Sequence, residues 1–562
     1  MVNKWQIYEI NEEQIEKISQ ENNINKLIAT ILSNKGITEK EQIEKFLNPT
    51  RSDFHDPYNM PDMEKAVERI LKAKQNNEKV IIYGDYDVDG ITSITVLKSF
   101  LKDIGIDAAY YIPNRIDEGY GLNIPAVENI AKEGYNLMIT VDCGITCIDE
   151  INRANELGME VIVTDHHEVG DSLPNAIAVV DCKRKDNKYQ CRDLAGVGVA
   201  FKLTQALAIK LGLDEKEYLK YLDIVCIGTI SDIVPLVDEN RVISKLGLML
   251  VNQTKNIGLK GLLNVSGYKK IDSLAISFGV APRINACGRM GHADEALKLF
   301  LSDNYNEVQK LTTTLNDYNR IRQEIEKTIY EEALVQIEKN KFEQNNTIVV
   351  AGNNWHHGVI GIVSSKITEM YFKPSILLCL EDGVATGSGR SIPGFDLHNA
   401  LTKCQNELVR FGGHSMAVGL TIKEENIQKF SEDLEKIAKD QHTEDIIPVI
   451  KIDAKISISQ INQEMVKSLK LLEPFGEANK MPVFLFKGLK IDSIRALSEG
   501  KHLKLTLKED NTIVDALGFN KGSLADEYRI GEQVDVVGTL EINSFNGVDS
   551  IQILIKDIMK SV

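Results

Sequence analysis

The chain has 562 residues, too many for one hydrophobic core, so we expect two to four domains. Hydrophobic residues make up 43% and charged residues 26%, as in globular proteins, and the formal net charge of −17 argues against binding nucleic acid over the whole surface while leaving a local basic groove open. No apolar run reaches transmembrane length and the first ten residues lack the core of a signal peptide, so we expect a cytoplasmic protein without membrane contact.

Residues 1–75 show the Glu, Lys, Ile and Leu pattern of helices, and none of their side chains indicates chemistry. From residue 79 onward, segments typical of strands alternate with segments typical of helices. Repeated strand-helix-strand units predict a parallel sheet with helices on both faces. We predict strands at 80–83, 108–112, 137–141, 160–164 and 176–180, and helices at 91–101, 124–132 and 148–157.

Three carboxylates, Asp85, Asp87 and Asp89, follow the first strand at every second position. In an extended segment they point to the same side, where their charges repel unless a cation lies among them. A divalent metal would be the simplest such cation. Aspartate-rich turns also follow strands because the side chain bonds to its own backbone, so this stretch alone leaves a metal site and a plain turn equally open.

Later segments end in further groups that bind metals. Asp142 ends strand 137–141, and Asp165, His166 and His167 follow strand 160–164, while Asp232 ends another apolar segment. Because parallel strands bring their carboxyl ends to one edge, these groups should converge, and turns alone explain such agreement poorly. Oxygen and imidazole ligands without thiolate suit Mn²⁺ or Mg²⁺ better than a structural zinc.

The second half of the chain predicts a long helix at 303–342, which links two domains, and a second α/β domain that starts at 347. This domain carries the motifs Trp355-His-His-Gly, Gly387-Ser-Gly-Arg-Ser and Phe411-Gly-Gly-His. The glycines beside Ser388 and Arg390 let the backbone approach a phosphate closely. Trp355 is as compatible with a core position as with a stacking surface. Short strands at 449–452, 483–486, 503–507, 514–518, 533–540 and 551–555 fit a five-stranded barrel.

Together the motifs resemble a known group of enzymes. Asp-x-Asp-x-Asp-Gly at 85–90, Val-Asp-Cys-Gly at 141–144, Asp-His-His at 165–167 and Ser-Asp-x-x-Pro-Leu at 231–236 resemble, in this order, the DHH phosphoesterase superfamily. The segments 111–122 and 281–292 narrow the resemblance to the RecJ family of single-strand-specific exonucleases. The resemblance covers nearly everything from residue 78 onward.

The resemblance implies an α/β multidomain fold that ends in a β-barrel. Its expected parts are an N-terminal helical segment (1–75), a parallel-sheet DHH catalytic domain (76–302), a linker helix (303–342), a DHH-associated substrate-binding domain (343–445) and an OB-fold domain (446–562).

The resemblance also implies two metal ions, Mn²⁺ or Mg²⁺, and a role for each side chain. Asp142 bridges the ions, Asp87 holds the first, and Asp89, His166 and Asp232 complete the second. His167 faces the scissile phosphate, and Asp165 orients its neighbours. The pyrophosphatase branch of the superfamily has a histidine where this chain has Tyr83, so either Asp85 replaces that ligand or the first ion is held loosely until substrate binds.

Nucleic-acid contacts are expected on both sides of the site. The resemblance assigns phosphates and the strand end to Arg115, Tyr120, Arg283, Arg289 and Arg390, and substrate contacts in the second domain to Ser388 and His414. A structural role for Arg283 and Arg289 stays open.

The resemblance implies stepwise 5′-to-3′ release of 5′-mononucleotides from single-stranded DNA, in DNA repair and recombination, by a monomer that works with a single-strand-binding protein and a helicase. Two alternatives remain. A small-substrate DHH phosphodiesterase, acting on nano-RNA or cyclic dinucleotides, would lack the segments around Arg115 and Arg283 and the barrel. A non-enzymatic nucleic-acid-binding replication scaffold would be expected to have lost metal ligands.

Overall fold

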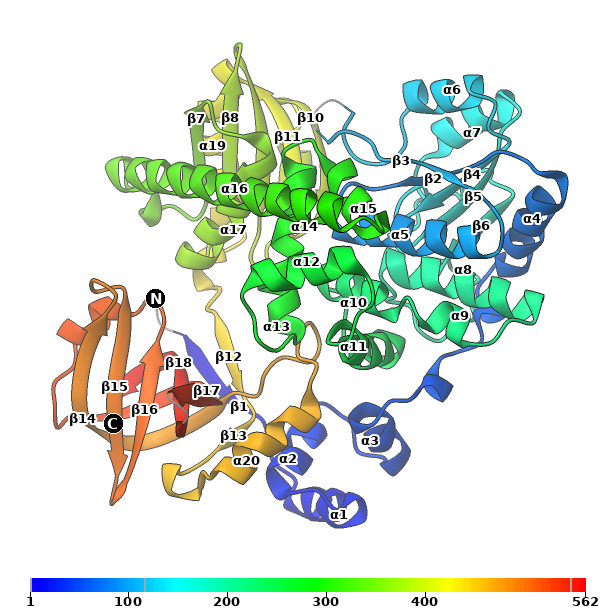
Figure 1. Cartoon of the computed structure of the whole chain (residues 1–562). Helices are drawn as coiled ribbons and strands as arrows, with labels where there is room; N and C mark the ends of the chain where they lie inside the picture. Colours follow the sequence, from blue (N-terminus) through cyan, green and yellow to red (C-terminus); the bar gives the residue numbers. More distant parts are fainter. Residues whose placement is uncertain (1–2, 116–117, 546–547, 562) are drawn as a thin grey trace. The chain divides into compact units, whose positions relative to one another are not determined.

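The computed structural model describes residues 3–115, 118–545 and 548–561 (Figure 1). Residues 116 and 117, inside the predicted segment 111–122, therefore lie outside the described residues. The chain divides into two compact units. The first holds Asp56–Asp232 and Gly247–Pro448, and the second combines Val2–His55, Ile233–Leu246 and Val449–Val562. This grouping cuts across the segment 1–75, and the domain boundaries given above stay predictions.

A parallel sheet of five strands, in the order β3-β2-β4-β5-β6, organises the first half of unit one (Figure 1). Its strands are rich in Val and Ile, and those in the middle are buried throughout. The chain places β3 on one side of β2 and β4 on the other, so ligands are expected between the carboxyl ends of β2 and β4. The strands are β2 (Val80–Gly84), β3 (Ala109–Tyr111), β4 (Leu137–Val141), β5 (Glu160–Asp165) and β6 (Ala178–Asp181).

Helices cover both faces of this sheet, as its sequence pattern predicts (Figure 1). Helices α6 (Ile124–Lys132) and α7 (Ile148–Glu156) pack on one face. The other face is covered by α4 (Met63–Asn76), α5 (Val88–Asp103) and α8 (Gly196–Leu211).

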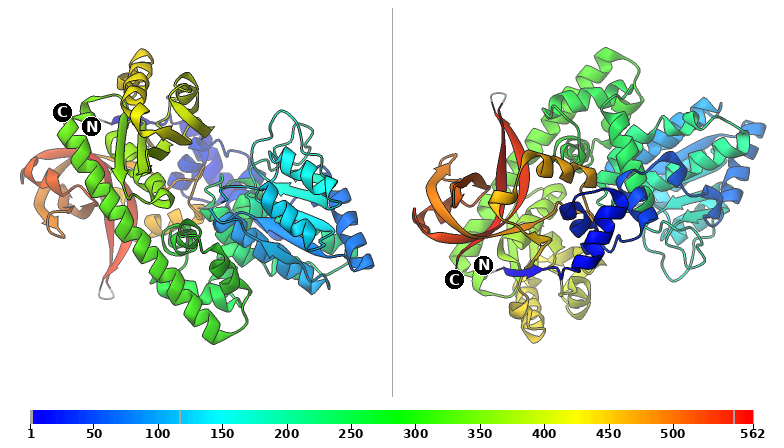
Figure 2. Two further views of the ribbon diagram at one scale, coloured as in Figure 1. Left: turned by 90° about the horizontal axis from the view of Figure 1, so that it is seen from above. Right: turned by 90° about the horizontal axis from the view of Figure 1, so that it is seen from below.

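A helical region joins this sheet to the next one. Its last helix, α16 (Tyr305–Asn340), runs for 36 residues and is seen along its length in Figure 2. Asn304 caps its first turn, accepting hydrogen bonds from the backbone N–H groups of Asn306 and Glu307. The preceding elements are α9 (Lys216–Leu219), α10 (Leu222–Ser231), α11 (Asp238–Val251), α12 (Ile257–Ser266), α13 (Ser273–Ala275), a π-helix (Ile276–Val280), α14 (Ala281–Arg289) and α15 (Ala293–Leu301).

The second half of unit one is built on a mixed sheet in the order β10-β11-β9-β8-β7. Only the β7–β8 pair is parallel among these pairings. One face packs on α16 and α17 (His357–Tyr371), and the other on α18 (Leu397–Lys403) and α19 (Ile427–Asp440). The strands are β7 (Ile348–Asn353), β8 (Ser375–Glu381), β9 (Val384–Arg390), β10 (Leu408–His414) and β11 (Ala417–Lys423).

Unit two is a closed barrel with helices from the beginning of the chain. Strand β14 pairs with both β15 and β17, which closes the order β14-β15-β16-β18-β17. Helices α1 (Glu12–Asn22), α2 (Lys26–Asn34) and α3 (Lys40–Leu47) contribute to the same hydrophobic core as the barrel strands. The remaining elements are β1 (Lys4–Ile7), β12 (Val449–Ile452), β13 (Ala454–Lys455), α20 (Gln463–Ser468), β14 (Phe484–Leu497), β15 (His502–Glu509), β16 (Thr512–Gly518), β17 (Gln533–Phe545) and β18 (Val548–Lys560).

The structure confirms the fold class and corrects several details. Residues Lys4–Ile7 form a strand rather than part of a helix, and they pair with β12, so the predicted strand 449–452 lies outside the barrel. The alternation argument for Asp85, Asp87 and Asp89 is wrong, because the strand ends at Gly84 and α5 already begins at Val88. Among the described residues, no helix is both long and apolar enough to cross a membrane.

Helix α10 carries Asp232 at its end and crosses α5 and α8 closely at Gly228. A Cβ atom at Gly228 would lie 2.3 Å from Thr92 Oγ1 and 2.7 Å from Val197 Cγ1. The absence of a side chain therefore allows the close approach that brings Asp232 near Asp89.

We expect Gly228→Ala to lower the free energy of unfolding by about 1–3 kcal/mol, because the added methyl group overpacks this crossing. The midpoint of urea unfolding measures the change. Gly170→Ala is the matched control, since nothing lies within 4 Å of a Cβ atom there, and should change the free energy by less than about 0.5 kcal/mol. Equal midpoints for the two variants would show that the helices separate without cost.

Candidate active site

The turn between β2 and α5 gathers the first three carboxylates. Asp87 caps α5, and its Oδ1 accepts hydrogen bonds from the backbone N–H groups of Asp89 (2.8 Å) and Gly90 (3.1 Å). A Cβ atom at Gly90 would lie 2.3 Å from the carbonyl oxygen of Asp85, so glycine is needed for so tight a turn. The positive end of the α5 dipole faces these carboxylates and favours their ionised form.

Asp142 follows β4 in the left-handed region, with φ 59°. Its backbone N–H donates to Thr164 O, which ties the turn to β5. The N-terminus of α8 presses against its side chain, and a Cβ atom at Gly196 would lie 2.7 Å from Asp142 Oδ1. The backbone therefore fixes where this carboxylate lies.

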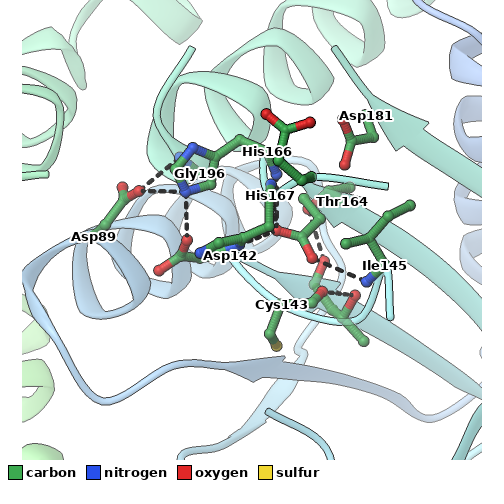
Figure 3. A network of polar contacts seen from close by, with 12 residues as sticks. Asp89, Asp142, Cys143, Ile145, Thr164, His166, His167, Asp181 and Gly196 are labelled. Atoms are coloured by element: carbon green, nitrogen blue, oxygen red, sulfur yellow. Dashed lines mark hydrogen bonds and ion pairs between the residues drawn. The ribbon is translucent and has the colours of Figure 1, made fainter. Parts of the chain in front are cut away.

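The same helix end holds Asp89. Its two carboxylate oxygens accept hydrogen bonds from the backbone N–H groups of Gly196 (2.6 Å) and Val197 (2.8 Å). Figure 3 shows the His166 imidazole between the carboxylates of Asp89 and Asp142. Two strand ends and two helix N-termini thus meet at one point.

The residues after β5 complete the network. Asp165 is buried and accepts hydrogen bonds from the backbone N–H groups of Ile145 (2.9 Å) and His166 (2.7 Å). Its Oδ1 also lies 2.7 Å from His167 Nδ1. His166 turns the other way, and its Nε2 lies 3.1 Å from Asp142 and 3.7 Å from both Asp89 and Asp232.

Three sets of these side chains could each hold a metal ion, because their ligand atoms lie within 4.8 Å of one another. Asp142 and His166 each belong to two sets, so neighbouring ions would share a ligand. The sets are Asp85, Asp87 and Asp142; Asp89, His166 and Asp232; and Asp142, His166 and His167.

The buried carboxylates of the site have raised pKa values, which indicates that a cation is needed to keep them ionised together. Burial and the neighbouring carboxylates raise the pKa of Asp89 to about 7 and that of Asp232 to about 9. The same causes raise the pKa of Asp85 and Asp142 well above the ordinary value. Burial and the charge of His167 lower the pKa of His166 to about 3, which leaves its imidazole neutral.

The donor set fits Mn²⁺ or Mg²⁺. His166 Nε2 and Asp85 Oδ1 are buried without a hydrogen-bond partner, as expected of atoms that coordinate a metal. Carboxylate oxygens with one neutral imidazole, and no thiolate in the three sets, are typical of Mn²⁺ and Mg²⁺ sites. Tyr83 is core, since it is fully buried and donates to Gly121 O, whereas Asp85 lies with the other carboxylates.

His167 and Asp165 act as a pair next to the metal sets. Burial opposes a charged imidazole, but the hydrogen bond to Asp165 and the nearby carboxylates raise the pKa of His167. Burial likewise opposes ionisation of Asp165, and the hydrogen bond from His167 outweighs it, so its pKa falls below the ordinary value. Tyr120 adds a third member, because its hydroxyl lies 3.2 Å from His167 Nε2 and from Asp142 O.

A second cluster, which we call the arginine cluster, consists of Arg115, Arg289 and Arg390. Burial and the charges of neighbouring arginines lower the pKa of Arg289 to about 10. Burial and the charge of Arg115 lower the pKa of Arg390. The Arg390 guanidinium donates to Ser388 Oγ at 3.0 Å. Three cations that repel one another across a shared space form a natural binding site for a phosphate.

Tyr86 connects the two clusters. It stands between Asp85 and Asp87 in the chain, and Arg115 lies over its ring at 5.1 Å. One member of the arginine cluster thus contacts the turn that carries two of the carboxylates.

Arg283 has structural partners, whereas His414 lies two strands away from Arg390 in the same sheet. Arg283 donates to Asn316 Oδ1 (3.0 Å), Val265 O (3.0 Å) and Gly279 O (2.5 Å), which makes it a structural link between helices. His414 ends β10, in register with Ala417, which itself pairs with Arg390. Trp355 is buried in the core and donates to Glu332.

The sequence interpretation missed Asp181 and Glu118. Asp181 ends β6 in register with Asp165, and burial, together with the charge of Asp165, raises its pKa to about 7. The strand-end rule that selected Asp142 would have found it. Glu118 accepts hydrogen bonds from Tyr111, Asn123 and the Asn114 backbone, and so holds the loop that presents Arg115 and Tyr120. Glu118 lies within the segment 111–122 that carries the family resemblance, but that segment alone does not indicate which of its side chains has a structural role.

Comparison with known families agrees with this architecture. The chain matches the DHH family N-terminal domain over residues 79–229, the DHHA1 domain over 344–440 and the RecJ OB domain over 452–557. The fold and the site thus define a protein of the DHH family with a DHHA1 domain.

Individual relatives are more specific. The single-stranded-DNA-specific exonuclease RecJ of Bacillus subtilis is 38% identical over 560 residues, which cover 99% of this chain and 70% of the relative. Crystal structures of RecJ from Thermus thermophilus in complex with Mn²⁺ and with Mg²⁺ match with TM-scores of 0.87 and 0.81 at 30% and 28% identity. They cover 100% of this chain and 80% and 79% of those chains. The chain belongs to the RecJ family of single-stranded-DNA-specific exonucleases.

Without divalent cations, we expect the free energy of unfolding to fall as the pH rises from about 4 to 9. The folded protein holds protons on Asp89 (pKa about 7) and Asp232 (pKa about 9) that the unfolded chain releases near its ordinary pKa of about 4, so stability is lost across this window. Thermal unfolding with a chelator measures the loss.

Added Mn²⁺ should oppose this loss because a cation favours the ionised carboxylates. Asp232→Asn is the control, since it removes one titrating group and should make the pH dependence shallower. A midpoint that stays constant from pH 5 to pH 9 in the chelator would contradict the electrostatic description.

Proposed function

We propose that this chain is a metal-dependent, single-strand-specific DNA exonuclease that hydrolyses phosphodiester bonds with two Mn²⁺ or Mg²⁺ ions. The observation that carries the proposal is that Asp142 belongs to two candidate metal sets, one with Asp85 and Asp87 and one with His166 and His167, and that His166 also belongs to the set with Asp89 and Asp232. Two ions held this way would lower the pKa of a water molecule and stabilise both the attacking and the leaving oxygens of an in-line displacement.

The side chains divide between the two ions. We assign Asp85 and Asp87 to the first ion, and Asp89, His166 and Asp232 to the second, with Asp142 as the shared ligand. Helix α8 fixes Asp89 through two backbone N–H groups, and it limits the positions open to Asp142 through Gly196. These carboxylates therefore need little rearrangement when an ion binds.

His167 acts on the substrate rather than on an ion. Its Nδ1 is bonded to Asp165, which favours the protonated imidazole and sets the ring plane. The Tyr120 hydroxyl lies 3.2 Å from both ring nitrogens of His167, and a ring nitrogen of His167 lies within 4.8 Å of the ligand atoms of Asp142 and His166. A protonated imidazole there would donate to an oxygen of the scissile phosphate and stabilise the charge that develops on it.

The arginine cluster binds the end of the strand. Arg115, Arg289 and Arg390 would hold a terminal phosphate, with the scissile phosphate one nucleotide away at the carboxylates. A site that holds the strand end one nucleotide from the carboxylates would release mononucleotides. We assign this end to the 5′ phosphate, which gives 5′-to-3′ polarity.

Neither alternative function is favoured by a structural observation. All of the predicted metal-ligating side chains are present and converge, which is not expected of a non-enzymatic scaffold. The barrel and the segment around Arg115, which a small-substrate phosphodiesterase would be expected to lack, are both present. The monomeric state, a single-strand-binding protein, a helicase and the cytoplasmic location stay predictions.

We expect Mn²⁺-dependent release of mononucleotides from the 5′ end of single-stranded DNA, and no release from a blunt duplex of the same sequence. Strands labelled at either end distinguish the polarity. Asp142→Ala should lower the rate by at least about a thousandfold, because both ions lose a ligand. Its circular dichroism spectrum should match that of the wild-type protein.

Two outcomes would contradict the proposal. Normal hydrolysis by a folded Asp142→Ala protein would exclude the shared ligand. Cleavage confined to dinucleotides or cyclic dinucleotides would favour the small-substrate phosphodiesterase.

We expect Arg390→Ala to weaken binding of single-stranded DNA about tenfold at low salt, since one charge-assisted hydrogen bond to phosphate is lost. The difference should shrink as salt rises, because a contact that no longer releases counterions makes the salt dependence shallower. Fluorescence anisotropy without divalent cations measures binding of the uncut strand. Arg320→Ala is the control, because Arg320 is exposed on α16 and paired with surface acids. Equal affinity in both variants would assign Arg390 a structural role.

A further inference from the structure

A cavity of about 220 Å³ opens beside the arginine cluster, and no contact described so far uses it. Its walls come from the turn that carries Tyr86, the segment after β3 with Pro113 and Arg115, and the junction of α14 and α15 with Gly288 and Ala293. A Cβ atom at Gly288 would lie 2.5 Å from Tyr86 O, so the glycine lets α14 approach this turn.

The position of the cavity links the two working parts of the site. Tyr86 stands between two carboxylates of the metal site, and Arg115 belongs to the arginine cluster. A single nucleotide must span from the terminal phosphate to the scissile phosphate. The cavity borders both parts of that span, because Tyr86 and Arg115 are both among its walls, so the base of this nucleotide can enter it.

The chemistry of the walls suits a flat, uncharged ring. Tyr86 and Pro113 offer apolar surface, and Ala293 takes up little space. The polar groups include one guanidinium, from Arg115, and one carboxylate, from Asp294, which also accepts a hydrogen bond from Tyr110 at 2.8 Å. A carboxylate in the wall disfavours a second phosphate but can accept a hydrogen bond from the amino or imino group of a base.

The size of the cavity limits what it holds. Pockets for drug-sized ligands measure about 300–1,000 Å³, so a cavity of about 220 Å³ takes one ring system rather than a dinucleotide. Contact with ring faces and nonspecific polar groups accepts every base, as an exonuclease requires.

We propose that this cavity receives the nucleobase of the terminal nucleotide before that nucleotide is released. The inference rests on the proposed function, since it assumes that the arginine cluster holds the strand end. It predicts that the terminal base, and not only the terminal phosphate, contributes to the Michaelis constant.

The test combines a filled cavity with a missing base. Two 5′-phosphorylated single strands are compared, one with an ordinary terminal nucleotide and one whose terminal residue is an abasic tetrahydrofuran analogue. For the wild-type protein, the abasic end should raise KM roughly tenfold, as expected for loss of contacts to one base. Ala293→Leu, which fills the cavity, should raise KM for the ordinary end by a similar factor.

The decisive result is the combination of the two changes. Ala293→Leu should leave KM for the abasic strand within about twofold of the wild-type value for that strand, because the base and the leucine compete for one space. Ala293→Ser adds almost no volume and should match the wild type on both strands. If Ala293→Leu shows no cooperative unfolding transition, Ala293→Val fills less space and should show the same pattern with a smaller factor.

Other patterns would overturn the inference. An equal rise in KM for both strands would mean that the filled cavity disturbs the site in another way, and no change for either strand would mean that the base lies elsewhere. Failure of the proposed function would look different, since the wild-type protein would then release no nucleotide from either strand.

Discussion

The main constraint on this structure is that the backbone holds several buried carboxylates close together although their charges repel one another. Asp89 is held by two N–H groups of α8, and Asp142 is confined by the turn after β4 and by Gly196. Burial and the mutual repulsion of the carboxylates favour the neutral form of these groups, as their raised pKa values show. A divalent cation among them favours the ionised form instead. The site therefore has a high affinity for cations, and its polar groups are fully satisfied only when a cation is bound.

Small residues make this arrangement possible. Gly90, Gly196 and Gly228 each stand where a methyl group would lie under 3 Å from another atom: the Asp85 backbone, the Asp142 side chain, and the side chains of Thr92 and Val197, respectively. They let α5, α8 and α10 converge on the carboxyl ends of β2 and β4. The close packing of these helices is what brings the carboxylates near enough to repel one another. Substitutions at these glycines should therefore change both the helix packing and the distances between the carboxylates.

Much of this site could be predicted because its residues follow a simple rule. Asp142 and Asp165 end parallel strands, and the order of the motifs resembles one family, so convergence at a sheet edge was predictable. Asp85, Asp87 and Asp89 all belong to the candidate metal sets, but strand alternation is not the reason. Asp89 lies in the first turn of helix α5 and not in an extended strand. The sequence left the role of Arg283 open, because a binding arginine and one that bonds three neighbouring groups look alike in sequence, and its hydrogen bonds favour the structural role. Strand Lys4–Ile7 was missed because its partner lies more than 400 residues away.

That distant pairing has a consequence for synthesis of the chain. Trp5 donates to Asp557 at 2.8 Å, and Ile28 and Leu32 are buried in the same core as the barrel strands. Residues 3–55 therefore cannot reach their final packing until roughly 400 further residues have left the ribosome, which takes about 20–80 s at ordinary rates of translation. During that interval their apolar side chains lack their partners. Residues 3–55 therefore complete their folding only after nearly the whole chain has been made.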